Sequence, residues 1–136
     1  MKYLLDTNIC IYTIRKRPVR VLKQFQEHDL GEIGISSITA AELWYGVGKS
    51  KQKEQNEKAL RQFLFPLEIV PFDSRAAETY GVIRALLENQ GKPIDPLDIL
   101  IAAQAVSMGT ILVTNNEKEF KHIPRLQIEN WATTKI

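Results

Sequence analysis

The sequence predicts an α/β fold in which helices cover both faces of a central, mostly parallel sheet, a three-layer α/β/α domain. Short apolar runs alternate with helical patterns along the chain, and the run at 110–114 is continuous and β-branched, as buried parallel strands are. The 136 residues, 44% of them hydrophobic, suffice for a single domain, residues 1–136, with a core of its own.

The first predicted unit contains a strand, a turn and two helices. The apolar run 2–5 ends at the polar turn 6–8, whose residue types cap helices, and a helical pattern occupies 9–15. Pro18 suits a first helical position, so a second helix is expected at 19–28.

The second unit repeats the order of strand and helix. Residues 32–36 alternate in the manner of a strand, and a helix is expected to begin at Ser37 or Thr39. The polar stretch 49–57 continues into an apolar helical stripe that Pro66 ends.

The third unit begins with a strand at 68–72 and a long amphipathic helix that ends at Gly91. Asp95 then caps a helix at 97–107, which is apolar on most sides and is therefore expected to be the most buried. The last elements follow from the same signals: a strand at 110–114, a short helix from Asn115 or Asn116 to Phe120, and a strand at 126–128.

Polar residues follow several of these strands. In an open parallel sheet, ligands bind outside the carboxyl ends of the strands. Carboxylate oxygens suit Mg²⁺ or Mn²⁺, and such an ion can lower the pKa of a bound water and direct it at phosphorus. We therefore expect a metal-dependent phosphodiesterase site built from Asp6, Glu42, Asp98, and Asn116 with Glu119.

Electrostatic repulsion supports a metal at this site. If Asp6, Glu42 and Asp98 lie within about 6 Å of one another, each pair repels by about 2.8 kcal/mol at an effective dielectric constant of about 20. A bound cation, or protonation of the carboxylates, is then needed for a stable fold.

Each of these positions also has a purely structural explanation. Glu42 follows Thr39, and Glu119 follows Asn116, at the spacing of a capping box, which is the better explanation of either glutamate taken singly. For Asp6, capping and function explain the residue equally well. Asp98, at the start of the most buried helix, favours a function.

Other chemistries lack their motifs. The sequence has no HExxH, CxxC, GxxxxGK[ST] or GxSxG pattern. His28 and His122 are expected on the solvated surface, and Cys10 is expected to be a buried thiol. Trp44 and Tyr45 are expected to pack in the core or in the contact of a homodimer, or else to stack on bases.

Two basic clusters follow the first two acidic positions. The net charge is low, with 18 lysines and arginines against 16 acidic residues, so it indicates no polyanionic partner by itself. Solvated helix faces explain any single basic residue, but two clusters beside an acidic pocket can follow a phosphate backbone. The residues expected to make such contacts are Arg15, Arg17, Lys49 and Lys51.

Four segments, taken in order, resemble the PIN-domain toxins of the VapC type: YLLDTNI, ITAAELWYGV, PLDILIAAQA and ILVTNNEKEF. The resemblance spans nearly the whole chain, and the ordered set is highly specific. It implies a PIN fold, Mg²⁺- or Mn²⁺-dependent endoribonuclease activity on cellular RNA, and inhibition by a VapB-type antitoxin. It also implies that Asp6, Glu42 and Asp98 hold the metal, with the Thr7 hydroxyl supporting them.

The resemblance has one departure. Where many relatives have Asp after the last central strand, this chain has Asn116, and Glu119 is the alternative ligand. The number of metal ions therefore stays open. The basic residues Arg15, Arg17, Lys49 and Lys51 are then candidates for contact with RNA or antitoxin.

Two other classes of function remain as alternatives. A receiver-like phosphoacceptor module needs an acidic pair after the first strand and a Lys after the last sheet strand, but Asp6 is unpaired and no Lys directly follows 110–114. The other alternative is a non-catalytic RNA- or protein-binding domain whose carboxylates only cap helices.

The expected location is the cytoplasm. The apolar start is interrupted at Asp6 and Asn8, unlike a signal peptide, and the single cysteine, Cys10, cannot form an internal disulfide. No apolar run is long enough for a membrane span, so no membrane association is expected.

Overall fold

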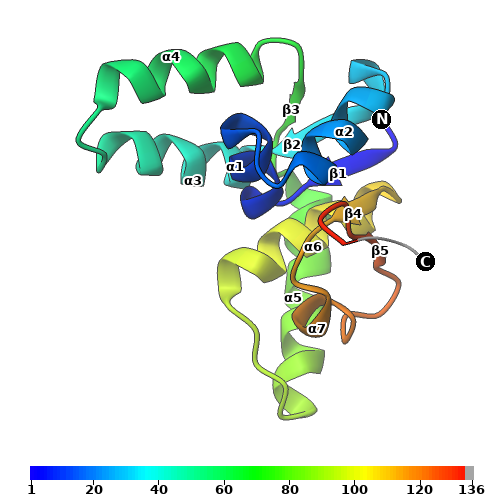
Figure 1. Ribbon diagram of the computed structural model, residues 1–136. Coiled ribbons are helices and arrows are strands. Elements are labelled where there is room, and N and C mark those ends of the chain that lie inside the picture. Colours follow the sequence, from blue (N-terminus) through cyan, green and yellow to red (C-terminus); the bar gives the residue numbers. More distant parts are fainter. Residues whose placement is uncertain (134–136) are drawn as a thin grey trace.

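The computed structural model describes residues 1–133 and contains a five-stranded sheet with the order β3-β2-β1-β4-β5 (Figure 1). Every neighbouring pair of strands is parallel. The strands are β1 (Tyr3–Leu5), β2 (Ile33–Ser36), β3 (Glu68–Val70), β4 (Ile111–Val113) and β5 (Gln127–Glu129). All five were predicted from short apolar or alternating runs.

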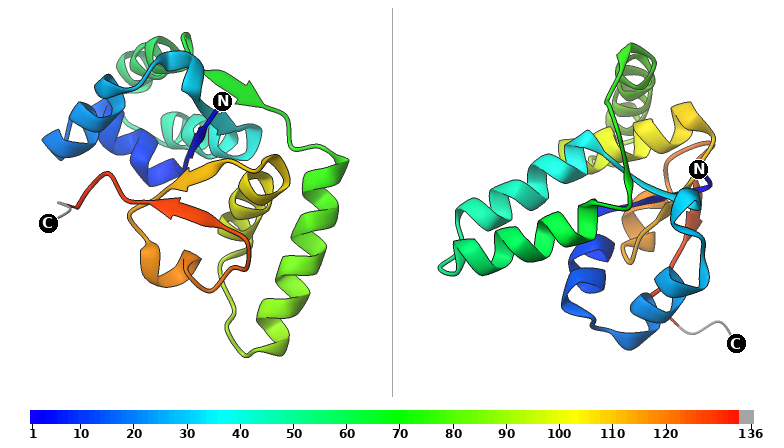
Figure 2. Two further views of the ribbon diagram at one scale, coloured as in Figure 1. Left: turned by 90° about the vertical axis from the view of Figure 1, so that its right-hand side faces the viewer. Right: turned by 90° about the horizontal axis from the view of Figure 1, so that it is seen from above.

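Helices cover both faces of the sheet, which confirms the three-layer α/β/α fold (Figure 2). Pro18 is the N-cap of the second helix and lies just before its first residue, one position ahead of the first helical position that the sequence analysis assigned to it. The helices are α1 (Thr7–Arg15), α2 (Val19–Glu27), the 3-10 turn η1 (Leu30–Glu32), α3 (Ser37–Gly48), α4 (Lys53–Leu64), α5 (Ser74–Asn89), α6 (Pro96–Met108) and α7 (Glu117–Phe120).

The central strand β1 contributes to two hydrophobic cores because its side chains alternate between the faces. Tyr3 and Leu5 pack in the core beneath α1 to α4, whereas Leu4 packs in the core beneath α5 to α7. A strand that is covered on both faces has no polar side, which is why β1 is a continuous apolar run in the sequence.

The second core is organised around α6. This helix buries most of its length, as its continuous apolar sequence predicted: Ile99, Ile101, Ala102, Ala103, Gln104 and Ala105. The helix α5 packs against α6 and contributes Ile83 and Leu87. The burial fixes the start of α6, and with it Asp98, relative to the sheet.

The surface position expected for His28 is wrong. Its ring stacks on that of Trp131, with 5.1 Å between ring centroids and an angle of 14° between planes, and lies 4.6 Å from the ring of Tyr3. The chain turns at the end of α2 and places His28 against Trp131, which lies just after β5. His122 is exposed and Cys10 is buried, as predicted.

In the part of the chain described, no helix combines the length and hydropathy needed to cross a bilayer.

Candidate active site

Two of the predicted acidic positions, Asp6 and Glu42, follow the ends of parallel strands. Asp6 directly follows β1, and its backbone N–H donates to the carbonyl of Val113 at the end of β4 over 3.0 Å. Glu42 belongs to α3, which directly follows β2. The strand order places β1 between β2 and β4, so these segments leave the same edge of the sheet next to one another.

Asp6 is both a helix cap and a member of a carboxylate group. Its Oδ1 accepts a hydrogen bond of 2.9 Å from the backbone N–H of Ile9, and the residue is only 5% exposed. Burial, with a smaller contribution from the nearby Glu42 carboxylate, raises the pKa of Asp6 to about 6, against the lowering effect of hydrogen bonds from Thr114 and the backbone. Asp6 therefore caps α1 and also lies close to a second carboxylate, that of Glu42.

Glu42 is not part of a capping box, so the structural explanation offered for it is wrong. The helix begins at Ser37 and is capped by the hydroxyl of Ser36, which accepts from the N–H of Ile38 over 3.0 Å. Thr39 therefore lies inside the helix and cannot be its cap. The Glu42 side chain accepts a hydrogen bond of 2.6 Å from the Thr7 hydroxyl.

Asp98 lies in the first turn of α6 and is half-buried. The cap of that helix is Asp95, whose Oδ1 accepts from the N–H of Leu97 over 2.9 Å. Burial, the facing carboxyl group of Glu119 and, to a smaller extent, Asp95 and Asp6 together raise the pKa of Asp98 to about 7. Asp98 is thus surrounded by other acids.

Asn116 and Glu119 also do not form the capping box that their spacing allowed. No side-chain hydrogen bond caps α7, and the Asn116 amide donates instead to the Glu119 carboxylate. Glu119 contacts both Asn116 and Asp98, so it connects the segment after β4 with the start of α6.

The sequence analysis missed Thr114 as a site residue. This buried residue follows β4, and its hydroxyl accepts from the N–H of Asn116 over 3.0 Å while it also bonds the Asp6 carboxylate. Only charged and amide residues after strands were considered, although the position of Thr114 in the sequence carried the same signal.

The oxygen donors fit a hard divalent cation by their chemistry. Within residues 1–133, no three His, Cys, Asp or Glu side chains are already arranged around a metal position. However, Asp6 and Asp98 are held close enough to other acids to raise their pKa values, and a cation among them relieves that repulsion. Carboxylate, hydroxyl and amide oxygens are the kind of ligand that hard divalent cations take.

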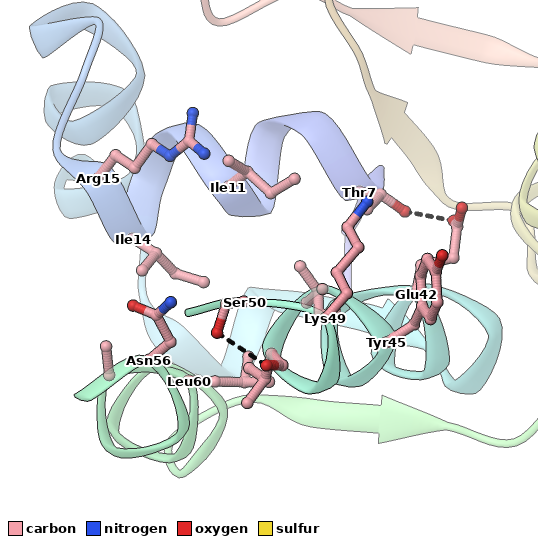
Figure 3. Close-up of a pocket in the computed structure, with 14 residues that line it drawn as sticks. Thr7, Ile11, Ile14, Arg15, Glu42, Tyr45, Lys49, Ser50, Asn56 and Leu60 are labelled. Carbon is pink, nitrogen blue, oxygen red and sulfur yellow. Dashed lines mark hydrogen bonds between the residues drawn. The ribbon is translucent and has the colours of Figure 1, made fainter. Parts of the chain in front are cut away.

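A groove of about 550 Å³ opens beside the Thr7–Glu42 pair, between α1, α3 and α4 (Figure 3). Apolar side chains such as Ile11 and Leu60 line its floor, and Lys49 lies at its edge with its Nζ 5.0 Å from the ring of Tyr45. The groove therefore joins an apolar channel to the acidic group.

Two of the four predicted basic contacts belong to this groove. Arg15 and Lys49 line it, whereas Arg17 and Lys51 are exposed outside its lining. Tyr45 is 69% exposed and so lies outside the core of the domain. Trp44 packs against the first core, as one of the predictions had it.

The parallel sheet and its acidic edge define an α/β domain of the PIN class, and the PIN domain model matches residues 3–126. The chain is 48% identical to Ribonuclease VapC2 of Rickettsia felis over 132 residues, covering 96% of this chain and 98% of the relative. It is 42% identical over 132 residues to the tRNA(fMet)-specific endonuclease VapC of Shigella flexneri, covering 97% and 99%.

Solved structures agree with the sequence relatives. A DNA-bound VapBC structure from Salmonella typhimurium matches with a TM-score of 0.91 and 42% identity, covering 96% of this chain and 98% of that one. The chain belongs to the PIN domain family and, within it, to the VapC ribonuclease toxins.

Proposed function

We propose that this ribonuclease hydrolyses RNA phosphodiester bonds with a Mg²⁺ ion, replaceable by Mn²⁺, held by Asp6, Glu42 and Asp98. The observation that carries the proposal is the charge environment of two acids, one buried and one half-buried. Every charged group that shifts the pKa values of Asp6 and Asp98 is another carboxyl group. A cation is the partner that such a group lacks.

A bound Mg²⁺ supplies an acidified water and neutralises charge on the phosphate oxygens. The protein's own residues orient the ligands. Hydrogen bonds from Thr114 and the Ile9 N–H fix the Asp6 carboxylate. The Thr7 hydroxyl donates to Oε1 of Glu42, so Oε2 would be the oxygen left for the metal.

Glu119 completes the site in this proposal, with Asn116 as its support. The carboxyl groups of Asp98 and Glu119 face each other, and the pKa of Asp98, raised to about 7, keeps Asp98 partly protonated near neutral pH. Loss of this proton gives the pair the charge that a divalent ion needs. The Asn116 amide, bonded to Glu119, orients the carboxylate.

We also propose that a VapB-type antitoxin inhibits the protein by seating a segment in the groove between α1, α3 and α4. Apolar lining favours the apolar side chains of such a segment, and the groove reaches Glu42 and Thr7 at one end. An Arg or Lys of the antitoxin can pair there with the carboxylates and compete with the metal.

The decisive experiment is incubation of the purified protein with RNA, with and without EDTA. Initiator tRNA is the first substrate to test, because a relative with this specificity is similar over nearly the whole chain. We expect cleavage with Mg²⁺ or Mn²⁺ and none in excess EDTA. Cleavage undiminished by EDTA, from protein free of other nucleases, excludes the metal mechanism.

The same experiment separates the alternatives. Binding of RNA without cleavage under any metal condition favours a non-catalytic domain. Mg²⁺-dependent phosphorylation of the protein by a small phosphodonor, without RNA cleavage, favours a receiver-like module.

A further inference from the structure

Asn130 is a buried side chain that connects segments around the acidic edge. It follows β5 by one residue and is 8% exposed. Its Nδ2 donates to Oδ1 of Asn115 over 3.1 Å and to Oε2 of Glu117 over 3.0 Å, and its Oδ1 accepts from the N–H of Ala132 over 2.8 Å. Both amide hydrogens and the carbonyl of Asn130 are therefore used.

The helix that Asn130 contacts is not stable by itself. Spanning Glu117–Phe120, α7 is a single turn without a side-chain N-cap, and short helices are marginal in water. Its fixed points are the buried ring of Phe120 and the Glu117 carboxylate that bonds Asn130. The candidate site residues adjoin these two points: Asn116 directly precedes Glu117, and Glu119 lies between Glu117 and Phe120.

Asn130 also reaches the first helix indirectly. The Asn115 amide that accepts from Asn130 donates in turn toward the Tyr12 hydroxyl of α1, over 3.5 Å. The segment after β4 is thus held from the end of β5 on one side and from α1 on the other.

We propose that Asn130 is a positioning residue for RNA hydrolysis, which it supports by holding residues 115–117 and thereby Glu119 against Asp98. The inference rests on the proposed function. Asn130 touches neither the metal ligands nor the substrate in this role. It acts through Asn115 and Glu117, by donating hydrogen bonds that an Asp of the same shape cannot donate.

The test uses an isosteric substitution and its reversal. Asn130→Asp keeps the side-chain volume but places a carboxylate against the Glu117 carboxylate. Adding Glu117→Gln places an amide donor at position 117, opposite the new carboxylate at position 130. The double variant therefore restores the bond between these two positions, with donor and acceptor exchanged. Asn89→Asp, at the exposed end of α5, introduces the same charge elsewhere and serves as the control.

Two quantities are measured for each variant. In Asn130→Asp we expect kcat on a fixed RNA to fall about tenfold or more, from the loss of a hydrogen bond to a charged group, with KM within about twofold. In metal-free protein, we expect amide hydrogen exchange at residues 116–120 to accelerate by about the same factor. The double variant recovers part of both quantities, because it restores the bond to position 117 and not the one to Asn115, and Asn89→Asp changes neither.

The outcomes separate this inference from the proposed function. Faster exchange at 116–120 with an unchanged kcat makes Asn130 purely structural and overturns the inference, as does an unchanged exchange rate. If the wild-type protein cleaves no RNA, the proposed function fails, whereas the exchange rates still report whether Asn130 holds the loop.

A second variant covers the case in which Asn130→Asp does not fold. Glu117→Ala removes one of the Asn130 bonds from an exposed residue. It must lower kcat in the same direction with KM retained, and an unchanged kcat overturns the inference.

Discussion

The hydroxyl of Thr7 donates a hydrogen bond of 2.6 Å to Oε1 of Glu42, across 35 positions of the chain. This contact joins the first turn of α1 to the second turn of α3 beside the buried Asp6. It shows that Glu42 is directed at the edge of the sheet and away from its own helix terminus.

The first prediction concerns this bond. Thr7→Val keeps the shape of the side chain and removes the donor, so Glu42 loses its orientation. Because hydrogen bonds to charged groups contribute about 1.5–3 kcal/mol, we expect RNA cleavage to fall by about ten- to a hundredfold. Thr7→Ser retains the hydroxyl and should retain most activity. Equal activity of the Val and Ser variants in a cleavage assay contradicts the assignment.

The second prediction separates the two roles of Asp6. Asp6→Asn retains a capping oxygen but removes a charge from an acidic group, so metal-free stability should hold or rise while cleavage falls by orders of magnitude. Asp73→Asn is the matched control, because Asp73 caps α5 in the same way, by accepting from the N–H of Ala76 over 3.0 Å. Near-wild-type cleavage by a folded Asp6→Asn protein would exclude Asp6 as a metal ligand.

The third prediction is the pH dependence of stability without metal. Burial raises the pKa of Asp6 from 3.8 to about 6, so between these values the folded state binds a proton that the unfolded state has lost. Stability must then rise as pH falls, with about 3 kcal/mol from Asp6 at most. Asp98, raised to about 7, acts in the same direction.

Thermal unfolding in EDTA between about pH 8 and pH 5 measures this effect, above the range where ordinary carboxylates titrate. We expect Tm to increase on acidification in the wild type and much less in Asp6→Asn. Excess Mg²⁺ should raise Tm most at the alkaline end, where the carboxylates are ionised. A wild-type Tm that decreases steadily from pH 8 to pH 5 in EDTA is inconsistent with the buried acidic group.

The fourth prediction decides which residue completes the metal site. Glu119 offers a charged oxygen facing Asp98, and Asn116 offers a neutral amide that bonds Glu119. Glu119→Gln should therefore weaken Mn²⁺ binding more than Asn116→Ala does. Equal affinities in Mn²⁺ titrations, or a greater loss in Asn116→Ala, reverse the assignment.

The fifth prediction concerns the antitoxin. If its basic side chain pairs with the carboxylates, neutralising Asp6, Glu42 and Asp98 together should weaken binding of the cognate antitoxin. The same antitoxin should inhibit the wild-type protein less as Mg²⁺ rises. An antitoxin that binds the neutralised variant as tightly, and leaves wild-type cleavage intact, contradicts this mode of inhibition.

The fold was predictable because buried strands and helices have characteristic apolar patterns in the sequence. Strands such as β1 and β4, covered on both faces, are continuous apolar runs, and α6 is apolar on nearly every side. Helix starts were less certain wherever polar residues adjoin. The sequence analysis expected α3 to begin at Ser37 or Thr39, whereas the hydroxyl of Ser36 caps this helix.

The site was predictable where residues carry charge and less so where they do not. Asp6, Glu42 and Asp98 followed from their positions after strands or at the start of a buried helix. Thr114 and Asn130 occupy comparable positions, but a neutral residue after a strand is common and gives no sign of its partners. The half-buried ring of His28 stacks on Trp131, far away in the chain, and no local pattern reports such a contact.

The strand order has a consequence for protein synthesis. The central strand β1 pairs on one side with β2, which follows it closely in the chain, and on the other side with β4, which is synthesised much later. A nascent chain that ends after β3 carries Asp6 and Glu42 without Asp98 or Glu119. The complete set of acidic residues therefore exists only when almost the whole polypeptide has been translated.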